Sequence, residues 1–204
     1  MEINIKKSTE EVLYLDYLSD SDILINVEDY AKLKVFEYNY DTSKKRIINL
    51  GLNSNIEYHY STYNLNDNNY SIEVNHLKNN SISNIYNHGI NAQNNKLVFN
   101  VTGKVLKNIS GCKTNQENTI INIEDGKSTI LPILLIDNFD ISSSHSAYIG
   151  KFKDNDLFYL MSKGLTKSSA INLLIKSIIL NSGDDTKNEF LSVLNKIRKE
   201  DING

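Results

Sequence analysis

Short segments rich in β-branched and aromatic residues recur roughly every 10 to 13 residues through the first two thirds of this chain. The segments are residues 22–27, 33–38, 46–50, 56–60, 70–74, 96–101, 119–124 and 130–136. Clusters of Asn, Asp, Ser and Gly separate them, as is typical of turns. Strands at this spacing without intervening helices predict a mostly β fold, whereas residues 8–18 fit either a helix or a strand.

Three architectures suit this pattern: a β-sandwich, a β-barrel and a β-solenoid, in which successive turns bury their faces by stacking. The Asn-rich turns favour the solenoid, because Asn can hydrogen-bond along a stack of strands and tolerates left-handed backbone angles. The periodicity alone leaves the choice open.

The hydrophobic period becomes helical near residue 150, which predicts a β core over residues 1–150 and a helical region over 151–204. The expected helices cover residues 154–164, from an Asp cap to a Gly, and 166–183, with a third beginning at a Thr186 capping box. The second helix carries an apolar stripe of Ile171, Leu174, Ile175 and Ile178. Leu173 and Ile179 lie off this stripe, which predicts that they face a partner or the end of the β core.

Composition excludes several classes of protein. A net charge of -3 with evenly spread Lys and Arg gives no basic stripe, so nucleic acid is not an expected partner. The apolar runs are too short to cross a bilayer and the N-terminal residues do not resemble a signal peptide, so we expect a cytoplasmic protein without a membrane partner. The single Cys112 forms neither an internal disulfide nor an all-cysteine metal cage, and a small buried or edge thiol is expected there.

Motifs for self-contained catalysis are missing from the sequence. It has no Gly-rich phosphate loop, no Gly-x-Ser-x-Gly elbow and no His-Glu-x-x-His pair. His59, His76 and His88 are a dozen or more residues apart and are expected to be satisfied or surface histidines. A carbohydrate-active enzyme would need clustered carboxylates, but the paired acids fit turns and helix caps. We therefore expect no enzymatic activity.

Residues 116–170 carry a gap-free set of motifs. "PILLIDNFDISSSHSAYIG" (132–150) resembles Pro-x-Leu-Glu-Ile…Asp-Asp-Val-x-Cys-x-His-Gly-Ala…Gly of the SufB/SufD family of iron–sulfur cluster assembly proteins. "LFYLMSKGLTKSSAINLLI" (157–175) resembles its Phe-Tyr-Leu-x-Ser-Arg-Gly-Ile…Ala signature, and "SIEVNHLKNNSISN" (71–84) is similar to an upstream segment of the family. The resemblance implies a right-handed parallel β-helix followed by a bundle of short helices, and it favours the solenoid among the three architectures.

The resemblance also implies a function. Family members assemble iron–sulfur clusters, pair through the ends of their β-helices, and dock a SufC-type ATPase on the C-terminal helices. We therefore expect a short SufD-like, non-enzymatic subunit that binds a SufC-type ATPase and either a SufB-type scaffold or a second copy of itself. The implied ATPase dock comprises Leu157, Phe158, Tyr159, Leu160, Ser162, Lys163, Gly164, Leu165 and Leu173. The alternatives are a free-standing β-solenoid interaction module and, less favoured, a carbohydrate-active β-helix enzyme.

The sequence departs from the family pattern at the positions of its cysteines. Glu117 stands where scaffold-type members carry a Cys, and Ser143 stands where SufD-type members carry another, two residues before His145. A serine hydroxyl is a poor ligand for iron–sulfur chemistry, which prefers thiolates. His145 and Glu117 are thus the remaining candidate ligands of a metal or cluster, and Ser143 and His145 the candidate interface residues. We expect no cluster to be held stably by the isolated chain, and at most a transient one in a complex.

A second family motif is preserved in part. The SufD-type sequence Gln-x-Asn-Arg is represented by Gln116 and Asn118, with Thr119 at the Arg position, and the Gly that follows the family His is Ser146 here.

Overall fold

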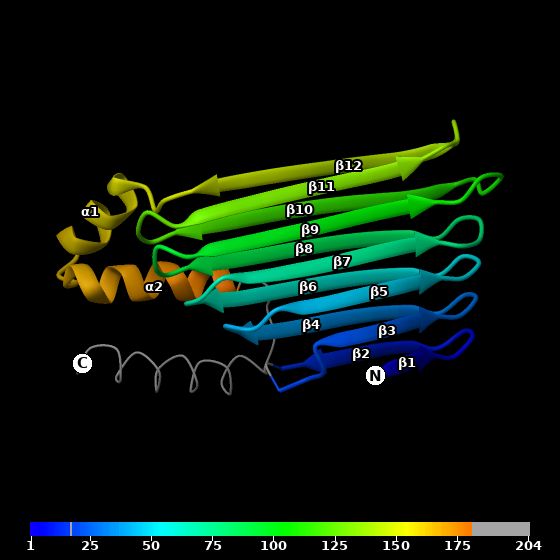
Figure 1. Cartoon of the computed structure of the whole chain (residues 1–204), viewed down its shortest axis with the longest axis horizontal. Helices are drawn as coiled ribbons and strands as arrows, with labels where there is room; N and C mark the ends of the chain where they lie inside the picture. Colours follow the sequence, from blue (N-terminus) through cyan, green and yellow to red (C-terminus); the bar gives the residue numbers. More distant parts are fainter. Residues whose placement is uncertain (17, 181–204) are drawn as a thin grey trace. The chain divides into compact units, whose positions relative to one another are not determined.

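The computed structural model describes residues 1–16 and 18–180 of the chain. The chain divides into two compact units, Met1–Lys151 and Phe152–Gly204, and each is described by itself. The described residues form twelve strands, all in the first unit, and two helices in the second (Figure 1).

The strands fall into two six-stranded sheets according to whether their number is odd or even. The first sheet contains β1 (Glu2–Ile5), β3 (Asp22–Val27), β5 (Lys44–Leu50), β7 (Asn68–His76), β9 (Lys96–Val105) and β11 (Lys127–Ile136). The second contains β2 (Glu10–Leu15), β4 (Lys32–Tyr40), β6 (Asn55–Asn64), β8 (Ile82–Asn91), β10 (Cys112–Asn122) and β12 (Ile141–Gly150).

Every strand pairs in parallel with the strand two positions along the chain. One turn therefore places one strand in each sheet, and successive turns stack along the axis, as Figure 1 shows for strands β1 to β12. The expected parallel β-solenoid is confirmed, and the sandwich and the barrel are excluded. Because parallel neighbours lie in register about 4.8 Å apart, side chains stack in columns along the solenoid.

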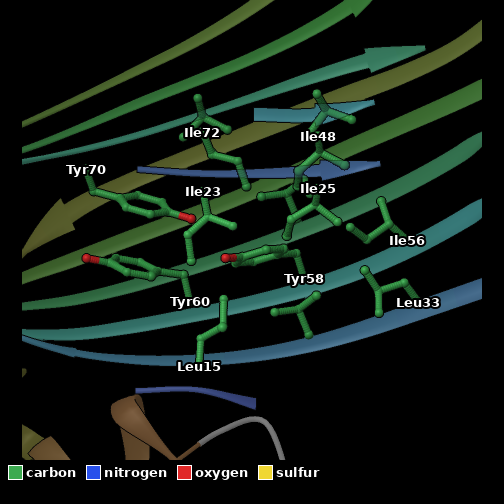
Figure 2. Close-up of a cluster of buried hydrophobic side chains, with 14 of the residues drawn as sticks. Leu15, Ile23, Ile25, Leu33, Ile48, Ile56, Tyr58, Tyr60, Tyr70 and Ile72 are labelled. Carbon is green, nitrogen blue, oxygen red and sulfur yellow. The ribbon is translucent and has the colours of Figure 1, made fainter. Parts of the chain in front are cut away.

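The core lies between the two sheets and consists mainly of aliphatic and tyrosine side chains (Figure 2). Strands alternate between buried and less buried residues, as β3 does with Ile23, Ile25 and Val27. The rings of Tyr60 and Tyr70, from opposite sheets, stack with centroids 3.5 Å apart. Both phenols are fully buried, and burial raises their pKa.

A charged pair also lies in this core. Arg46 and Glu37 are each 0% exposed, and the guanidinium donates to the Glu37 carboxylate from Nε at 3.0 Å and from Nη2 at 2.5 Å. The Tyr58 hydroxyl donates to the same carboxylate at 2.5 Å. Arg46 Nη1 also donates to carbonyl oxygens of the loop between β2 and β3, at Asp20 (3.1 Å) and Ser21 (2.8 Å). Both charges are therefore paired and hydrogen-bonded, which is what their burial requires.

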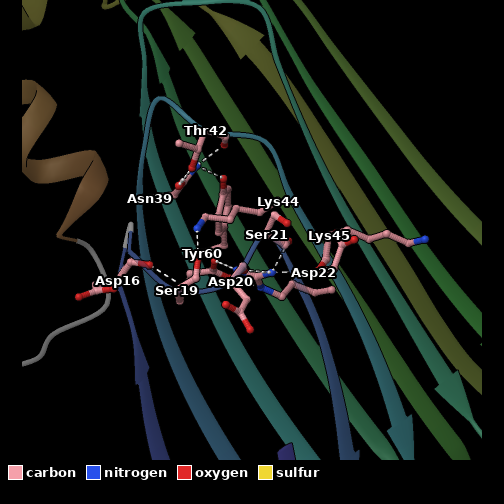
Figure 3. A network of polar contacts seen from close by, with 12 residues as sticks. Asp16, Ser19, Asp20, Ser21, Asp22, Asn39, Thr42, Lys44, Lys45 and Tyr60 are labelled. Carbon is pink, nitrogen blue, oxygen red and sulfur yellow. Dashed lines mark hydrogen bonds and ion pairs between the residues drawn. The ribbon is translucent and has the colours of Figure 1, made fainter. Parts of the chain in front are cut away.

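The polar contacts near that loop are drawn in Figure 3. The Lys44 ammonium donates to the carbonyl oxygen of Ser19 at 2.5 Å, and the Asn39 amide donates to Thr42 O at 2.6 Å and to the Tyr60 hydroxyl at 3.0 Å. Burial lowers the pKa of Lys44. These bonds connect the loop and the β4–β5 turn to the adjacent core.

Asparagines form hydrogen-bonded ladders along the stack. On the outer face of the odd-numbered sheet, Asn26 donates to Asn4, Asn49 to Asn26 and Asn75 to Asn49, at 2.9 to 3.1 Å. Asn53, Asn80 and Asn108 adopt left-handed backbone angles in turns. Asparagine thus serves the solenoid in the two ways expected from the sequence.

Several strands differ from the sequence-based expectations. Residues 8–18, which fitted a helix or a strand, contain β2, and the segment-based analysis missed β1, β8 and β12. In β8 the inward positions include Ser83 and Asn87, which hydrogen-bond to Thr114 and Asn118 on β10. Their polar character hides the hydrophobic alternation by which strands are recognised.

The second unit contains α1 (Asp154–Ser162) and α2 (Lys167–Ile179). α1 begins after Lys153 rather than at an Asp cap; Asp154 and Asp156 lie in its first turn, where carboxylates favour the helix dipole. Thr166 caps α2 as expected, accepting a bond from Ser169 N. The expected third helix lies outside the described residues. No helix among the described residues is long and apolar enough to cross a membrane.

The apolar face of α2 is rotated relative to the expected stripe. Its buried residues are Ala170, Ile175 and Ile179, so Ile179, which lies off the expected stripe, belongs to the buried face. Leu173, also off the stripe, is exposed. The period of 3.6 residues fits more than one stripe on a helix with apolar residues on several sides, so packing decides which face is buried.

Candidate functional site

His145 lies on β12, the last strand of the even-numbered sheet. β12 pairs with β10 on one side, with Gln116 opposite His145 and Thr114 opposite Ser143. Gln116 and Thr114 are buried between the sheets, so His145 and Ser143 face the same interior side. Both are nevertheless exposed, because no further turn among the described residues stacks on β12. We call this face the open end of the solenoid.

The last turn exposes further groups on both of its strands. Ala147 and Ile149 continue the interior-facing row of β12, and both are exposed. β11, the last strand of the other sheet, exposes Leu131, Ile133 and Leu135. These three point outward, next to the polar side chains of Asn100, Thr102 and Lys104 on β9. The last turn thus exposes apolar side chains in a sheet whose other outward positions are mostly polar.

Glu117 lies on the opposite face of the sheet from His145. It is in register with Ser146 rather than with His145, and its carboxylate accepts a hydrogen bond from Asn115 Nδ2 at 3.1 Å on the outer surface. The structure therefore brings Ser143 and His145 together on one face and does not bring Glu117 to them.

The residues of the open end do not make a cluster-binding set. His145 provides one imidazole and Ser143 a hydroxyl, whereas iron–sulfur clusters are held mainly by thiolates. Cys112 is on the same strand as Gln116 and four residues away, about 13 Å along the strand, with its thiol buried against Ser81 Oγ at 3.4 Å. Within the described residues, no group of three or more His, Cys, Asp or Glu could hold a metal ion.

Two of the other three histidines, His76 and His59, have polar partners within the fold. His76 is 0% exposed; its Nδ1 lies 2.8 Å from Ser81 Oγ and its Nε2 3.0 Å from Ser83 Oγ, and burial lowers its pKa to about 4. His59 contacts Glu57 at 2.6 Å. Burial lowers the pKa of His88. All three lie on earlier turns of the solenoid than His145, on β6, β7 and β8.

The helical unit exposes a second group of predicted site residues. On α1, Phe158 and Tyr159 are 66% and 63% exposed, and Leu173 of α2 is also exposed. The helix ends where expected, because Gly164 has a φ of +92°, a left-handed angle that favours glycine. The Lys163 ammonium lies 5.5 Å from the Tyr159 ring centroid. Leu157, Leu160 and Leu165 are half-buried, and Ser162 donates to Tyr159 O.

The open end and the helical unit both lie within the part of the chain that one family model matches. A family model described as the SufBD core domain of SUF system FeS cluster assembly matches residues 25–178. The chain belongs to the SufB/SufD family. The resemblance inferred from the motifs is thereby confirmed, and the match spans both the solenoid from β3 onward and the two described helices.

Curated SufB/SufD relatives are similar to parts of the chain. The iron–sulfur cluster assembly protein SufD of Bacillus subtilis is 32% identical over 108 residues, 52% of this chain and 25% of that protein. SufB of the same organism is 27% identical over 130 residues, 63% of this chain and 28% of that protein. A SufBD family protein of Pyrococcus horikoshii is 36% identical over 72 residues, 35% of this chain and 16% of that protein. The chain thus spans about a quarter of the length of the first two relatives.

Two features of this SufB/SufD family chain escaped the sequence analysis. Arg46 and Glu37 gave no signal, because a charged pair nine residues apart on successive strands looks like any pair of surface charges. Gln116 was noticed only as part of a family motif, although its alternation with Thr114 and Asn118 could have placed it in the interior beside His145.

Proposed function

We propose that this chain is a non-enzymatic, SufD-like subunit of a SUF-type iron–sulfur cluster assembly complex. The observation that carries the proposal is the match to the SufBD core domain across both units. In this complex, the open end would pair with a SufB-type scaffold or a second copy of this chain, and the helical unit would dock a SufC-type ATPase.

The exposed aromatic residues of α1 support the ATPase-docking part. Phe158 and Tyr159 are neighbours in the Phe-Tyr-Leu motif and leave about two thirds of their surface in contact with solvent. Aromatic residues of this kind provide the anchors of many protein interfaces. Lys163 and Leu173 add a cation and an apolar side chain to the described part of this surface.

The docking test mixes the purified chain with the SufC-type ATPase of the same organism and measures binding by size-exclusion chromatography and calorimetry. Replacing Phe158 by Ser should weaken binding about 30-fold, which corresponds to about 2 kcal/mol for one interface anchor. Phe139→Ser, at a Phe in the first unit that is even more exposed than Phe158, is the matched control and should bind like the wild type. Absence of a complex with the wild-type chain, or equal effects of the two variants, would refute the dock.

The exposed interior-facing row of β12 supports the pairing part. Side chains that face the inside of a solenoid are covered by the next turn, and on β12 a partner can supply that cover. The neighbouring apolar residues of β11 enlarge the surface that such a partner would bury.

A pair of adjacent serines tests the pairing surface. Ser143→Lys places a charge on the interior-facing row, and Ser142→Lys places the same charge on the outer face of the same strand. Light scattering should show that Ser143→Lys prevents association with itself or with the SufB-type scaffold, and that Ser142→Lys does not. Association with the scaffold alone identifies a heterodimer, and association of the pure chain identifies a homodimer. If neither association occurs in the wild type, the chain is a free-standing module and this part is wrong.

A further inference from the structure

The amide of Gln116 is buried directly beneath the open end. Its side chain is 1% exposed, and Nε2 donates to the carbonyl oxygen of Ile133 over a long distance of 3.5 Å. Oε1 is buried as well and has no hydrogen-bond donor in the part of the chain that the structure describes. Buried carbonyl oxygens almost always accept a hydrogen bond, so this atom requires a donor.

The surroundings of the amide are shaped to hold it. A Cβ at Gly103 on β9 would lie 3.1 Å from Gln116 Nε2, 3.1 Å from Thr114 Oγ1 and 3.2 Å from a methyl group of Leu134. The amide therefore fills space that a side chain at Gly103 would occupy. Gly103 and β11 fix it from the opposite sheet, and its position does not depend on a flexible surface contact.

The stacking of strands restricts which group can be the donor. Gln116 is in register with Ile85 on β8 and with His145 on β12. The side chain of Ile85 has no polar atom and cannot donate. On β10 itself, Asn118 donates from Nδ2 to Ser146 O at 3.0 Å, and neither Asn118 nor Thr114, both buried, places a donor on Gln116 Oε1. His145 faces the same side as Gln116 at the usual strand spacing of about 4.8 Å. Its ring carries an N–H donor in either neutral tautomer, and the ring has no hydrogen bond within residues 1–16 and 18–180.

We infer that Gln116 is the positioning residue of His145. In this structure the His145 ring does not reach Gln116 Oε1, but rotation of this exposed side chain brings a ring N–H to that oxygen. The bond selects one neutral tautomer and leaves the lone pair of the other ring nitrogen directed toward the open end. This is how a carbonyl oxygen commonly orients a histidine that acts through its second nitrogen. The inferred contact between Gln116 and His145 lies within this chain and does not depend on the proposed function. Only the use of the second ring nitrogen, by a partner or its iron, rests on the proposed function. Glu117, on the other face, takes no part in it.

The test is ¹⁵N NMR of the histidine side chains of the isolated chain at about pH 9, where a histidine ring is neutral. The tautomer of His145 is read from its two ring nitrogen shifts, which are assigned by comparison with His145→Asn. We expect one dominant tautomer in the wild type. Gln116→Met removes the amide at nearly constant length and should lower the tautomer ratio about fivefold, the effect of one hydrogen bond.

Two further variants make the result specific. In Gly103→Ala the added methyl group displaces Gln116 Nε2 while Gln116 itself is unchanged, so the tautomer ratio should shift in the same direction. This variant keeps the inference testable if Gln116→Met does not fold. Asn115→Ala removes an amide from the outer face of the same strand and should leave the ratio unchanged. Equal tautomer populations in the wild type, or a ratio that neither variant changes, would overturn the inference and assign a water or a partner as the donor. A chain that shows the tautomer but binds no scaffold or ATPase refutes the proposed function alone.

Discussion

Acidification should destabilise the folded chain through His76. The imidazole is fully buried between two serine hydroxyls, and burial lowers its pKa from 6.5 to about 4. Between these values the unfolded chain binds a proton that the folded chain does not bind, so the free energy of unfolding falls as the pH falls. From pH 6.5 to pH 5 the loss is about 1.36 kcal/mol per pH unit, or about 2 kcal/mol.

The measurement is urea unfolding followed by circular dichroism at pH 7.5 and pH 5, for the wild type and for His76→Gln. Gln can hydrogen-bond to Ser81 and Ser83 but does not titrate, so the variant should lose about 2 kcal/mol less between the two pH values. His145→Gln, at an exposed position, is the control and should follow the wild type. If His76→Gln and the wild type lose the same free energy, His76 is accessible to protons in the folded chain and the reasoning fails.

Two further predictions concern the buried ion pair and the lost cysteine. Arg46→Met leaves the Glu37 carboxylate buried without its cation and should lower the free energy of unfolding in urea by about 3 to 5 kcal/mol. The double variant Arg46→Met with Glu37→Leu should recover most of this loss. Equal stability of the single and double variants would contradict the pairing. Ser143→Cys restores a thiolate beside His145, so after anaerobic reconstitution with iron and sulfide and desalting it should retain more cluster absorbance than the wild type. Ser142→Cys, on the outer face, is its control, and a stable cluster in the wild type or an equal gain in this control would contradict the prediction.

The order of the elements was accessible from the sequence wherever side chains alternate between apolar and polar. β3, β4, β5, β6, β7, β9 and β11 were recognised because each contains a short run rich in β-branched, aliphatic or aromatic residues. β8 and β12 were missed, because polar inward residues such as Ser83 and Ser143 give no hydrophobic period. The choice of a solenoid came from the family resemblance, because the pairing of each strand with the second strand along the chain leaves no local trace.

The sequence located only part of the candidate site, because pairing between distant strands decides which residues meet there. The motif located His145, Ser143 and the exposed aromatic residues of α1, and no structural information was needed to see that the cysteines are replaced. Which side chains share a face depends on the register between strands about thirty residues apart. The register placed Gln116, rather than Glu117, beside His145.

The sequence by itself determined the strand-to-helix order, the family and the loss of the thiol ligands, because these depend on residue types and local spacing. Tertiary structure alone decided the solenoid's stacked columns, the burial of Arg46 with Glu37, and the unsatisfied Gln116 amide below His145. These depend on which residues meet across neighbouring turns and between the two sheets. A shift of one residue in register would move every side chain of β12 to the other face of the sheet.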